Sequence, residues 1–370
     1  MITFKEAKKN FGFGCMRLPM LDNGEVDTDQ FSKMVDAFIG AGFNYFDTAH
    51  GYLKGKSETA LRTSLTSRYP RDAYVLADKL SENFFTTNEE IIPFFQSQLE
   101  ACGVEYFDFY LMHAQNKRNY EQYRSCKAYE TALKLKEEGK IRHLGISFHD
   151  SAEMLDRILT EYPFVEFVQL QFNYIDFEDE GVQSRRCYEV CRKHNKPVIV
   201  MEPVKGGSLV SLPEEAGAIL DSLGGGSHAS YAIRYAASFE GVEMVLSGMG
   251  NMDMMNDNIN TFRNFVPIKE VEFEIFDKVR ETIRKTRQIP CTKCNYCAEV
   301  CPSDIPISRL FSVYNRFLGA NISRAEFRKE LEKDRETLSG CVGCGACEGN
   351  CPQSIKIREE LGKIGEIINR

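Results

Sequence analysis

Two kinds of hydrophobic pattern alternate along the first 263 residues. Short apolar runs predict buried β-strands at 12–17, 44–47, 73–79, 107–113, 141–147, 167–171, 197–201 and 243–247. Between them, apolar residues recur at helical spacing, as in Phe31, Met34, Val35 and Phe38. This spacing predicts helices at 29–41, 88–102, 120–138, 151–162, 180–194 and 252–263, and a glycine-rich loop at 203–226 precedes one more.

Eight strands separated by helices predict an α/β fold, a closed parallel (β/α)₈ TIM barrel. An open doubly wound sheet is the competing fold, but no G-x-G-x-x-G follows an early strand to support it. The chain has 370 residues, more than one core usually holds, so we expect a second domain. We predict a barrel over 1–267, a connecting helix over 268–287 and a small α-rich domain over 288–370.

Within the last domain, Ile322 to Leu338 and residues 353–370 are predicted to be helical. The formal net charge is −8, and no dense basic face is present, which argues against nucleic acid as a partner. No apolar run reaches membrane-spanning length, so we expect no membrane partner. Residues 1–10 are rich in lysine and lack an apolar signal core, so we expect a cytoplasmic location.

Polar residues stand at the ends of three consecutive predicted strands. These are Asp47, Lys79 and His113, separated by 32 and 34 residues, and Tyr52 follows Asp47 in a loop. In a (β/α)₈ barrel the reactive residues lie at the C-terminal ends of the strands. We therefore expect these four side chains to converge at one mouth of the barrel.

The four residue types suit the reduction of a carbonyl group. A hydride that reaches a carbonyl carbon leaves an alkoxide, which needs a proton, but a phenol of pKa ~10 gives up its proton reluctantly. A nearby ammonium stabilises the phenolate, and a carboxylate balances the buried ammonium. A histidine can orient the carbonyl oxygen. Taken singly, Lys79 could be a solvated strand end and His113 a core histidine; the set at barrel intervals favours catalysis.

The segments F-D-T-A-H-G-Y, L-A-D-K-L and F-Y-L-M-H resemble the aldo-keto reductase family in residue order and spacing. The resemblance covers residues 1 to about 265 and implies an oxidoreductase with Asp47, Tyr52, Lys79 and His113 as catalytic residues. It implies NADPH as the cofactor and a small-molecule carbonyl as the substrate. The residues that carry over as cofactor-binding are Gly14, Met16, Arg17, Asp47, Ser147, Gln169, Gly248, Asn251, Asp257 and Asn258.

Three positions depart from the family pattern. Cys15 stands where many members have threonine, and Met201-Glu202-Pro203 stands where an aromatic ring often stacks on the nicotinamide. The segment S-G-M-G-N at 247–251 has no Lys or Arg for a 2′-phosphate, so NADH stays an alternative to NADPH. Phe84, Phe85 and Tyr120 in the loops suggest an apolar or ring-shaped carbonyl.

Eight of the 13 cysteines form two runs of C-x₂-C-x₂-C-x₃-C-P, at 291–302 and 341–352. This is the bacterial ferredoxin pattern for [4Fe–4S] clusters, in which the fourth cysteine of each run binds the other cluster. It assigns one cluster to Cys291, Cys294, Cys297 and Cys351, and the second to Cys341, Cys344, Cys347 and Cys301. Zinc is the alternative, but it gives no reason for a third cysteine and a Cys-Pro at the same offset in both runs.

The two halves lead to two hypotheses. In the first, the chain is an NAD(P)H-dependent carbonyl reductase with two [4Fe–4S] clusters that exchange electrons with a redox partner protein, sense redox state or brace the fold. In the second, the barrel is a nicotinamide-binding module of a larger electron-transfer complex and reduces no carbonyl itself. A hydride carries two electrons and a cluster accepts one, so the chemistry of the barrel does not explain why the tail has clusters.

Overall fold

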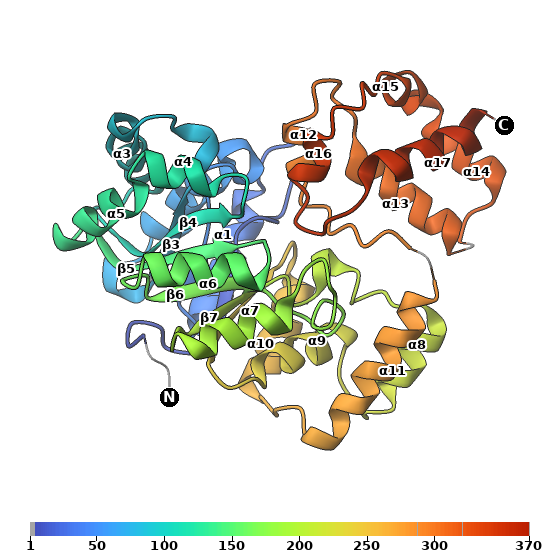
Figure 1. Cartoon of the computed structure of the whole chain (residues 1–370). Coiled ribbons are helices and arrows are strands. Elements are labelled where there is room, and N and C mark those ends of the chain that lie inside the picture. Colours follow the sequence, from blue (N-terminus) through green and yellow to red (C-terminus); the bar gives the residue numbers. More distant parts are fainter. Residues whose placement is uncertain (1–3, 287, 320, 370) are drawn as a thin grey trace. The chain divides into compact units, whose positions relative to one another are not determined.

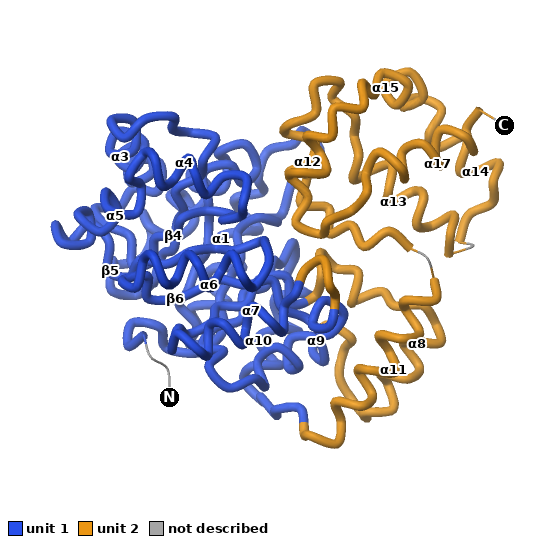
Figure 2. The backbone as a smooth tube through the Cα atoms, viewed as in Figure 1, with its two compact units in different colours: residues 1–178, 183–203, 230–268 blue, residues 179–182, 204–229, 269–370 orange. Residues whose placement is uncertain are grey.

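The computed structural model describes residues 4–286, 288–319 and 321–369. The chain forms two compact units, which Figure 2 shows in different colours. The barrel unit consists of residues 1–178, 183–203 and 230–268, and the tail unit of residues 179–182, 204–229 and 269–370. The tail unit therefore includes the glycine-rich loop that follows the seventh strand.

Eight parallel strands close into a barrel in chain order, which confirms the predicted (β/α)₈ fold (Figure 1). The strands are β1 (Phe11–Gly14), β2 (Tyr45–Asp47), β3 (Val75–Leu80), β4 (Phe107–Gln115), β5 (Ile141–Phe148), β6 (Phe167–Gln171), β7 (Val198–Met201) and β8 (Val242–Gly248). Strand β1 pairs with both β2 and β8, so the sheet has no open edge.

Helices with one apolar face cover the barrel. In α1 (Thr28–Gly40), Phe31, Met34, Val35 and Phe38 are all fully buried. The other helices that belong wholly or largely to this unit are α2 (Lys56–Leu61), α3 (Ile91–Cys102), α4 (Tyr120–Ser125), α5 (Ala128–Glu137), α6 (Ala152–Glu161), α7 (Ser184–Lys193), α9 (His228–Ala237) and α10 (Met252–Arg263).

The prediction of one long helix over 120–138 was wrong. The chain breaks between α4 and α5 because Lys127 adopts a left-handed conformation, with φ of 53°. The carbonyl of Cys126 accepts a hydrogen bond from Asn88 Nδ2 at 2.7 Å, and the Cys126 thiol bonds to the carbonyl of Thr86. Contacts to the segment before α3 therefore fix the turn, and no local signal marks it.

Two further element predictions need correction. The helix predicted over 180–194 begins only at Ser184, because Asp179 Oδ1 accepts hydrogen bonds from the backbone N–H groups of Gly181 and Val182 and forms a turn. The loop predicted over 203–226 contains a helix, α8 (Glu214–Asp221), between its glycines.

Apolar side chains fill the N-terminal end of the barrel. Phe4 packs edge-on against Phe109 and Phe167, with ring centroids 4.9 and 5.7 Å away. Gly145 is required beside them, since a Cβ there would lie 2.4 Å from the Phe167 ring. This end is a packed core, which leaves the opposite end of the strands to carry polar groups.

The tail unit is helical. Its helices are α8, α11 (Phe273–Arg284), α12 (Tyr296–Glu299), α13 (Ile307–Leu318), α14 (Arg324–Leu331), α15 (Arg335–Ser339), α16 (Ala346–Gly349) and α17 (Ile357–Asn369). The helix predicted over 322–338 is broken into α14 and α15 by a 3₁₀ segment at Glu332–Asp334, and α13 was missed. The predicted C-terminal helix is present as α17.

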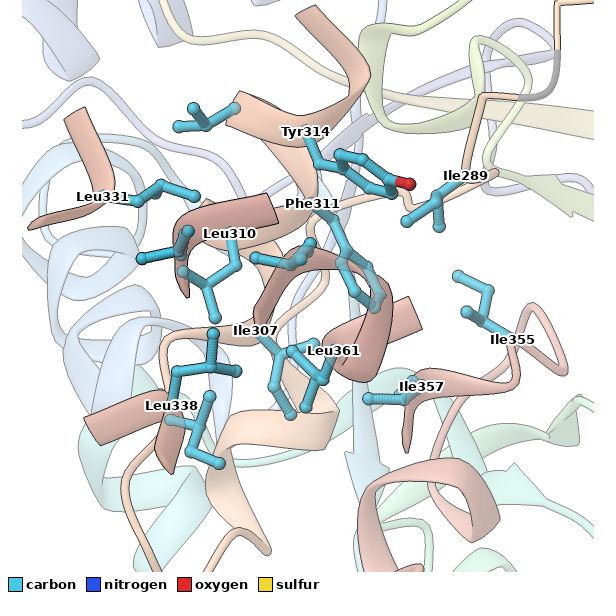
Figure 3. Close-up of a cluster of buried hydrophobic side chains, with 14 of the residues drawn as sticks. Ile289, Ile307, Leu310, Phe311, Tyr314, Leu331, Leu338, Ile355, Ile357 and Leu361 are labelled. Carbon is cyan, nitrogen blue, oxygen red and sulfur yellow. The ribbon is translucent and has the colours of Figure 1, made fainter. Parts of the chain in front are cut away.

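The tail repeats itself at an offset of 50 residues. Cys291 corresponds to Cys341, α12 to α16 and α13 to α17. The backbone repeats as well: Lys293 and Asn295 in the first run, like Gly343 and Gly345 in the second, have positive φ. Figure 3 shows the core that both halves share, in which Ile307, Phe311 and Leu361 are almost fully buried. No helix among the described residues is long and apolar enough to cross a membrane.

Candidate active site and cluster sites

Lys79 stands at the centre of the polar groups in the barrel. It is the penultimate residue of β3, and its side chain is fully buried. Its Nζ donates hydrogen bonds to Asp47 Oδ1 at 2.7 Å and to the backbone carbonyl of Thr48 at 2.6 Å. Asp47 ends β2, the neighbouring strand, so the barrel register itself brings the two charges together.

Tyr52 lies directly over this ion pair. It begins a 3₁₀ segment (Tyr52–Gly55), in which Leu53 and Lys54 have φ of 54° and 58°. Such a conformation is costly for residues other than glycine and occurs often at functional sites. The ring centroid of Tyr52 is 4.9 Å from Lys79 Nζ and 5.9 Å from the imidazole of His113. The structure thus brings all four predicted catalytic residues together.

His113 is a neutral imidazole at physiological pH. Burial, followed by the charge of Lys79 and by His149, holds the pKa of His113 well below its usual range. Its Nδ1 lies 2.5 Å from Ser81 Oγ. With the Ser81 hydroxyl donating to Nδ1, the proton of the ring resides on Nε2, which is then a hydrogen-bond donor.

Gln169 and Ser147, predicted to contact the nicotinamide, are both buried at the same end of the barrel. Gln169 Nε2 donates to Asp47 Oδ2 at 3.0 Å, so both carboxylate oxygens of Asp47 are bound. Ser147 Oγ accepts a hydrogen bond from the N–H of Ala114, whose φ is 48°. Ser147 therefore also holds the irregular backbone that follows His113.

A second group of predicted residues meets where β1 and β8 end. Gly14 and Gly248 are register partners in the sheet, and the Arg17 side chain passes over Gly248. Met16 lies in the turn that follows β1, directly before Arg17, and is partly exposed. Arg17 forms an ion pair with Glu202 at 3.0 Å, and Glu202 has φ of 55° and one buried carboxylate oxygen without a hydrogen-bond partner.

The remaining predicted residues lie on or before α10. Asn251 is the N-cap of this helix, and its Oδ1 accepts the Met254 N–H at 2.9 Å. Asn258 is buried and donates to Ser247 Oγ at 3.0 Å, which ties α10 to β8. Asp257 lies one position earlier and is partly exposed.

A buried acid pair lies behind Lys79. The carboxyl groups of Glu58 and Asp78 have oxygens within 4.8 Å of each other and of the Cys102 sulfur. Burial raises the pKa of Glu58 to about 7, and burial together with the charge of Glu58 raises the pKa of Asp78 well above its usual value. Asp78 Oδ1 accepts the backbone N–H of Lys79, and His50 bonds to Glu58 Oε2 at 2.8 Å.

The tail brings cysteines of both runs together. The thiol of Cys297 interacts electrostatically with Cys347, the weakest of its cysteine partners, and more strongly with Cys294, Cys291 and Cys351, which together with Cys297 form a group of four. We call these four residues the first cluster site. Cys351 comes from the second cysteine run and thus lies near cysteines of the first run.

The other four cysteines line one cavity. Cys301, Cys341, Cys344 and Cys347 line the same cavity, and we call them the second cluster site. Cys341 and Cys344 are exposed, whereas Cys347 is buried. Arg358 also lines this cavity.

The spacing of the tail cysteines does not suit a single zinc ion. Four sulfurs bound tetrahedrally at 2.3 Å would lie about 3.8 Å apart. Among the described residues, one group of three or more possible metal ligands has its ligand atoms within 4.8 Å of one another. It consists of Glu58, Asp78 and Cys102 and includes no tail cysteine. A cavity lined by four cysteines that come from both runs fits a multi-iron cluster.

Sequence reasoning missed Ser81, the carbonyl of Thr48 and the Glu58–Asp78 pair. Ser81 follows Lys79 by two residues, and this strand-end position was the one available signal. The sequence contains no such signal for Glu58, because this residue lies on α2, 20 residues before Asp78. Contacts of this kind depend on how the helices pack against the strands.

Comparison with known proteins agrees with this geometry. The model of the aldo/keto reductase family matches residues 10–281, which is most of the chain. The chain belongs to the aldo/keto reductase family. A 4Fe–4S dicluster domain model matches residues 290–356 of the chain, a range that contains all eight tail cysteines.

The curated relatives of the chain are distant. The 9,11-endoperoxide prostaglandin H2 reductase of Trypanosoma cruzi is 27% identical over 208 residues, which are 55% of this chain and 65% of that protein. An aldo-keto reductase of Mycolicibacterium smegmatis is 28% identical over 33% of this chain and 42% of its own length. The chain thus spans less than two thirds of the length of these relatives.

Solved structures share the barrel. An aldo/keto reductase of Klebsiella pneumoniae, in complex with NADP and acetate, has 18% sequence identity and a TM-score of 0.61 over 73% of this chain and 91% of that one. The holo form of an aldo-keto reductase of Bacillus halodurans has 23% identity and a TM-score of 0.59 over 73% and 91%. At this level of identity, the similarity concerns the fold.

Proposed function

We propose that the barrel is an NAD(P)H-dependent reductase that converts a small aldehyde or ketone to an alcohol, with Tyr52 as the proton donor. The observation that carries this proposal is the position of the Lys79 ammonium, between Asp47 Oδ1 at 2.7 Å and the Tyr52 ring at 4.9 Å. An ion pair with only a structural role would have no reason to lie against a phenol and a neutral imidazole.

The proton transfer rests on Tyr52 and Lys79. The Tyr52 hydroxyl gives its proton to the oxygen of the former carbonyl, and the phenolate that remains is stabilised by the adjacent ammonium. Asp47 pairs with that ammonium inside the barrel, where an unpaired charge would be costly. General acid catalysis of this kind contributes roughly 10²–10⁴-fold to the rate.

His113 orients the carbonyl. With Ser81 donating to Nδ1, the Nε2–H of His113 donates a hydrogen bond to the carbonyl oxygen and polarises it. A neutral imidazole serves this purpose better than a charged one, since it leaves the proton delivery to Tyr52. His113 is thereby a positioning donor and Tyr52 the acid.

The cofactor would be held by the predicted residues around the strand ends. When bound, NAD(P)H supplies the hydride that reduces the carbonyl carbon. Ser147 and Gln169 would hold its carboxamide, and Gly14 and Gly248 would line its site at the β1–β8 end. The other residues that we expect to contact the cofactor are Met16, Arg17, Asp47, Asn251, Asp257 and Asn258. The complexes of the Klebsiella reductases with NADPH and NADP support a choice of NADP(H).

The tail would hold two [4Fe–4S] clusters, one at each cluster site. When present, each cluster carries one electron at a time. The exposure of Cys341 and Cys344 at the second cluster site supports electron exchange with a redox partner protein. That exposure also favours a second candidate function, an electron-transfer module that binds a nicotinamide but reduces no carbonyl.

The test uses the full chain with its clusters loaded, under anaerobic conditions. NADPH is added first, then aldehydes and ketones of increasing size, including ring-bearing ones. NADPH consumption only when a carbonyl is present supports the reductase, and Tyr52→Phe should abolish it. Full activity of Tyr52→Phe would contradict the proposal. Bleaching of the clusters by NADPH alone, without turnover of any carbonyl, would favour the second function.

A further inference from the structure

A lysine from the glycine-rich loop lies beside the first cluster site. Lys205 follows β7 by four residues and belongs to the tail unit. Its side chain is buried in spite of its charge, with a relative exposure of 4% for the residue. Its Nζ donates a hydrogen bond to Gln353 Oε1 at 2.5 Å, and Gln353 comes two residues after Cys351.

The backbone of the loop fixes this position. Gly206, with φ of 62°, packs so closely on the first cysteine run that a Cβ there would lie 2.2 Å from the carbonyl oxygen of Thr292. Thr292 is buried and stands next to Cys291. Lys205 itself has φ of 48°, a conformation that a lysine adopts rarely. The loop therefore holds the ammonium in place against the cysteines.

The charge of Lys205 acts on two cysteines of the first cluster site. It interacts electrostatically with the sulfurs of Cys291 and Cys351. The second cluster site has a different cation, Arg358, whose side chain is 49% exposed and ion-paired with Glu348 at 2.7 Å. Solvent and the carboxylate weaken the field of that guanidinium.

We propose that the buried ammonium of Lys205 raises the reduction potential of the cluster at the first cluster site. The inference rests on the proposed function of the tail, that both sites hold [4Fe–4S] clusters. Reduction adds one electron to a cluster and makes it more negative by one charge. A positive charge that is buried nearby stabilises that product more than an exposed one does, because little solvent screens it.

The electron balance is simple. The oxidised cluster accepts one electron, no bond to a cysteine breaks, and dithionite supplies the electron in the test. Lys205 takes no part in the transfer and alters only its equilibrium. A change of tenfold in that equilibrium corresponds to a shift of about 59 mV for a one-electron couple.

The test is a redox titration of the full cluster-loaded chain, followed by electron paramagnetic resonance. Lys205→Met removes the charge and keeps an unbranched side chain. Lys293→Met is the matched control, because Lys293 interacts with Cys291 more strongly than Lys205 does but is exposed to solvent. In Lys205→Met, we expect one of the two midpoint potentials to fall by at least about 59 mV, which is a tenfold change in the reduction equilibrium of that cluster. In Lys293→Met, we expect little change in either potential. Lys205→Arg should restore the wild-type value.

Iron and sulfide analysis separates the failure of this inference from the failure of the proposed function. A wild-type chain that assembles no pair of [4Fe–4S] clusters would refute the function proposed for the tail. Two assembled clusters with unchanged potentials in Lys205→Met would overturn the inference alone, as would equal shifts in Lys205→Met and Lys293→Met. Lys205→Gln is a second neutral variant, included in case the methionine disturbs the fold. Loss of one cluster from both neutral variants would overturn the inference and indicate that Lys205 has a structural role.

Discussion

The ammonium of Lys79 lies 2.7 Å from Asp47 Oδ1 and 4.9 Å from the centre of the Tyr52 ring. One buried cation thus connects a strand-end carboxylate to a phenol that comes from a strained loop segment. The carboxylate is held in turn by Gln169 on β6. The proposed acid is therefore supported by three different strands, which keeps its environment rigid.

Removing either member of the Lys79–Asp47 pair should destabilise the protein. Lys79→Met leaves a buried carboxylate unpaired, and we expect a loss of about 3–5 kcal/mol in the free energy of unfolding. Lys79→Met combined with Asp47→Leu should recover part of that stability but none of the carbonyl reduction. Chemical denaturation and NADPH turnover of the single and double variants measure both effects. Recovery of activity in the double variant would show that the pair has only a structural role.

Ser81 should act on catalysis through His113. Ser81→Ala removes the hydroxyl that lies 2.5 Å from His113 Nδ1, so the imidazole loses the partner that sets its tautomer. We expect kcat/KM for the carbonyl to fall roughly tenfold, since a hydrogen bond of this kind contributes about 1–1.5 kcal/mol. The Kd for NADPH, measured by quenching of protein fluorescence, should not change. An equal loss in cofactor binding would indicate a general disturbance of the site.

The Glu58–Asp78 pair should make the protein less stable as the pH rises. Burial raises the pKa of Glu58 from 4.5 to about 7 in the folded protein. Its contribution to stability is therefore fully present below about pH 4.5 and is lost as the pH rises through about 7. We expect a loss of roughly 3–4 kcal/mol across this range, at about 1.4 kcal/mol per pKa unit.

Glu58→Gln should flatten this pH dependence, because a neutral amide replaces the titrating carboxyl. The exposed Glu89→Gln is the matched control and should keep the wild-type slope. Denaturant unfolding at a series of pH values gives both slopes. A wild-type slope in Glu58→Gln would mean that the carboxyl does not titrate as described.

Loss of a predicted ligand should remove one cluster. Cys341→Ala takes a sulfur from the second cluster site, so we expect the iron content to fall from two clusters per chain to one. Cys191→Ala, which changes a buried cysteine of the barrel unit, should keep both clusters. Iron analysis after anaerobic reconstitution decides the outcome. Full iron content in Cys341→Ala would contradict the assignment of this cysteine.

The regular parts of the fold could be predicted from the sequence because their apolar residues repeat with a fixed period. Strand β6 and helix α10 begin and end where the pattern predicts. The break between α4 and α5 could not be predicted, because Lys127 and Cys126 form it with Asn88, 38 residues upstream of Cys126. Tertiary contacts there outweigh the helical pattern of 120–138.

Some residues of the site could likewise be predicted from the sequence, and others could not. Asp47, Lys79 and His113 could be identified because each stands at a strand end, where a barrel places its reactive groups. Ser81, Glu58 and Lys205 could not, because their partners come from distant segments of the chain. Lys205 and Gln353, for example, are 148 residues apart.

The measurement that tests the central claim most directly follows the hydride itself. NADPH that carries deuterium on the nicotinamide carbon that donates hydride is incubated anaerobically with the loaded protein and a reactive aldehyde. The account predicts an alcohol with deuterium on its carbinol carbon, and a loss of this product in Tyr52→Phe by roughly 10²-fold or more. Oxidation of the cofactor without a deuterated alcohol, or an undiminished yield from Tyr52→Phe, would contradict it.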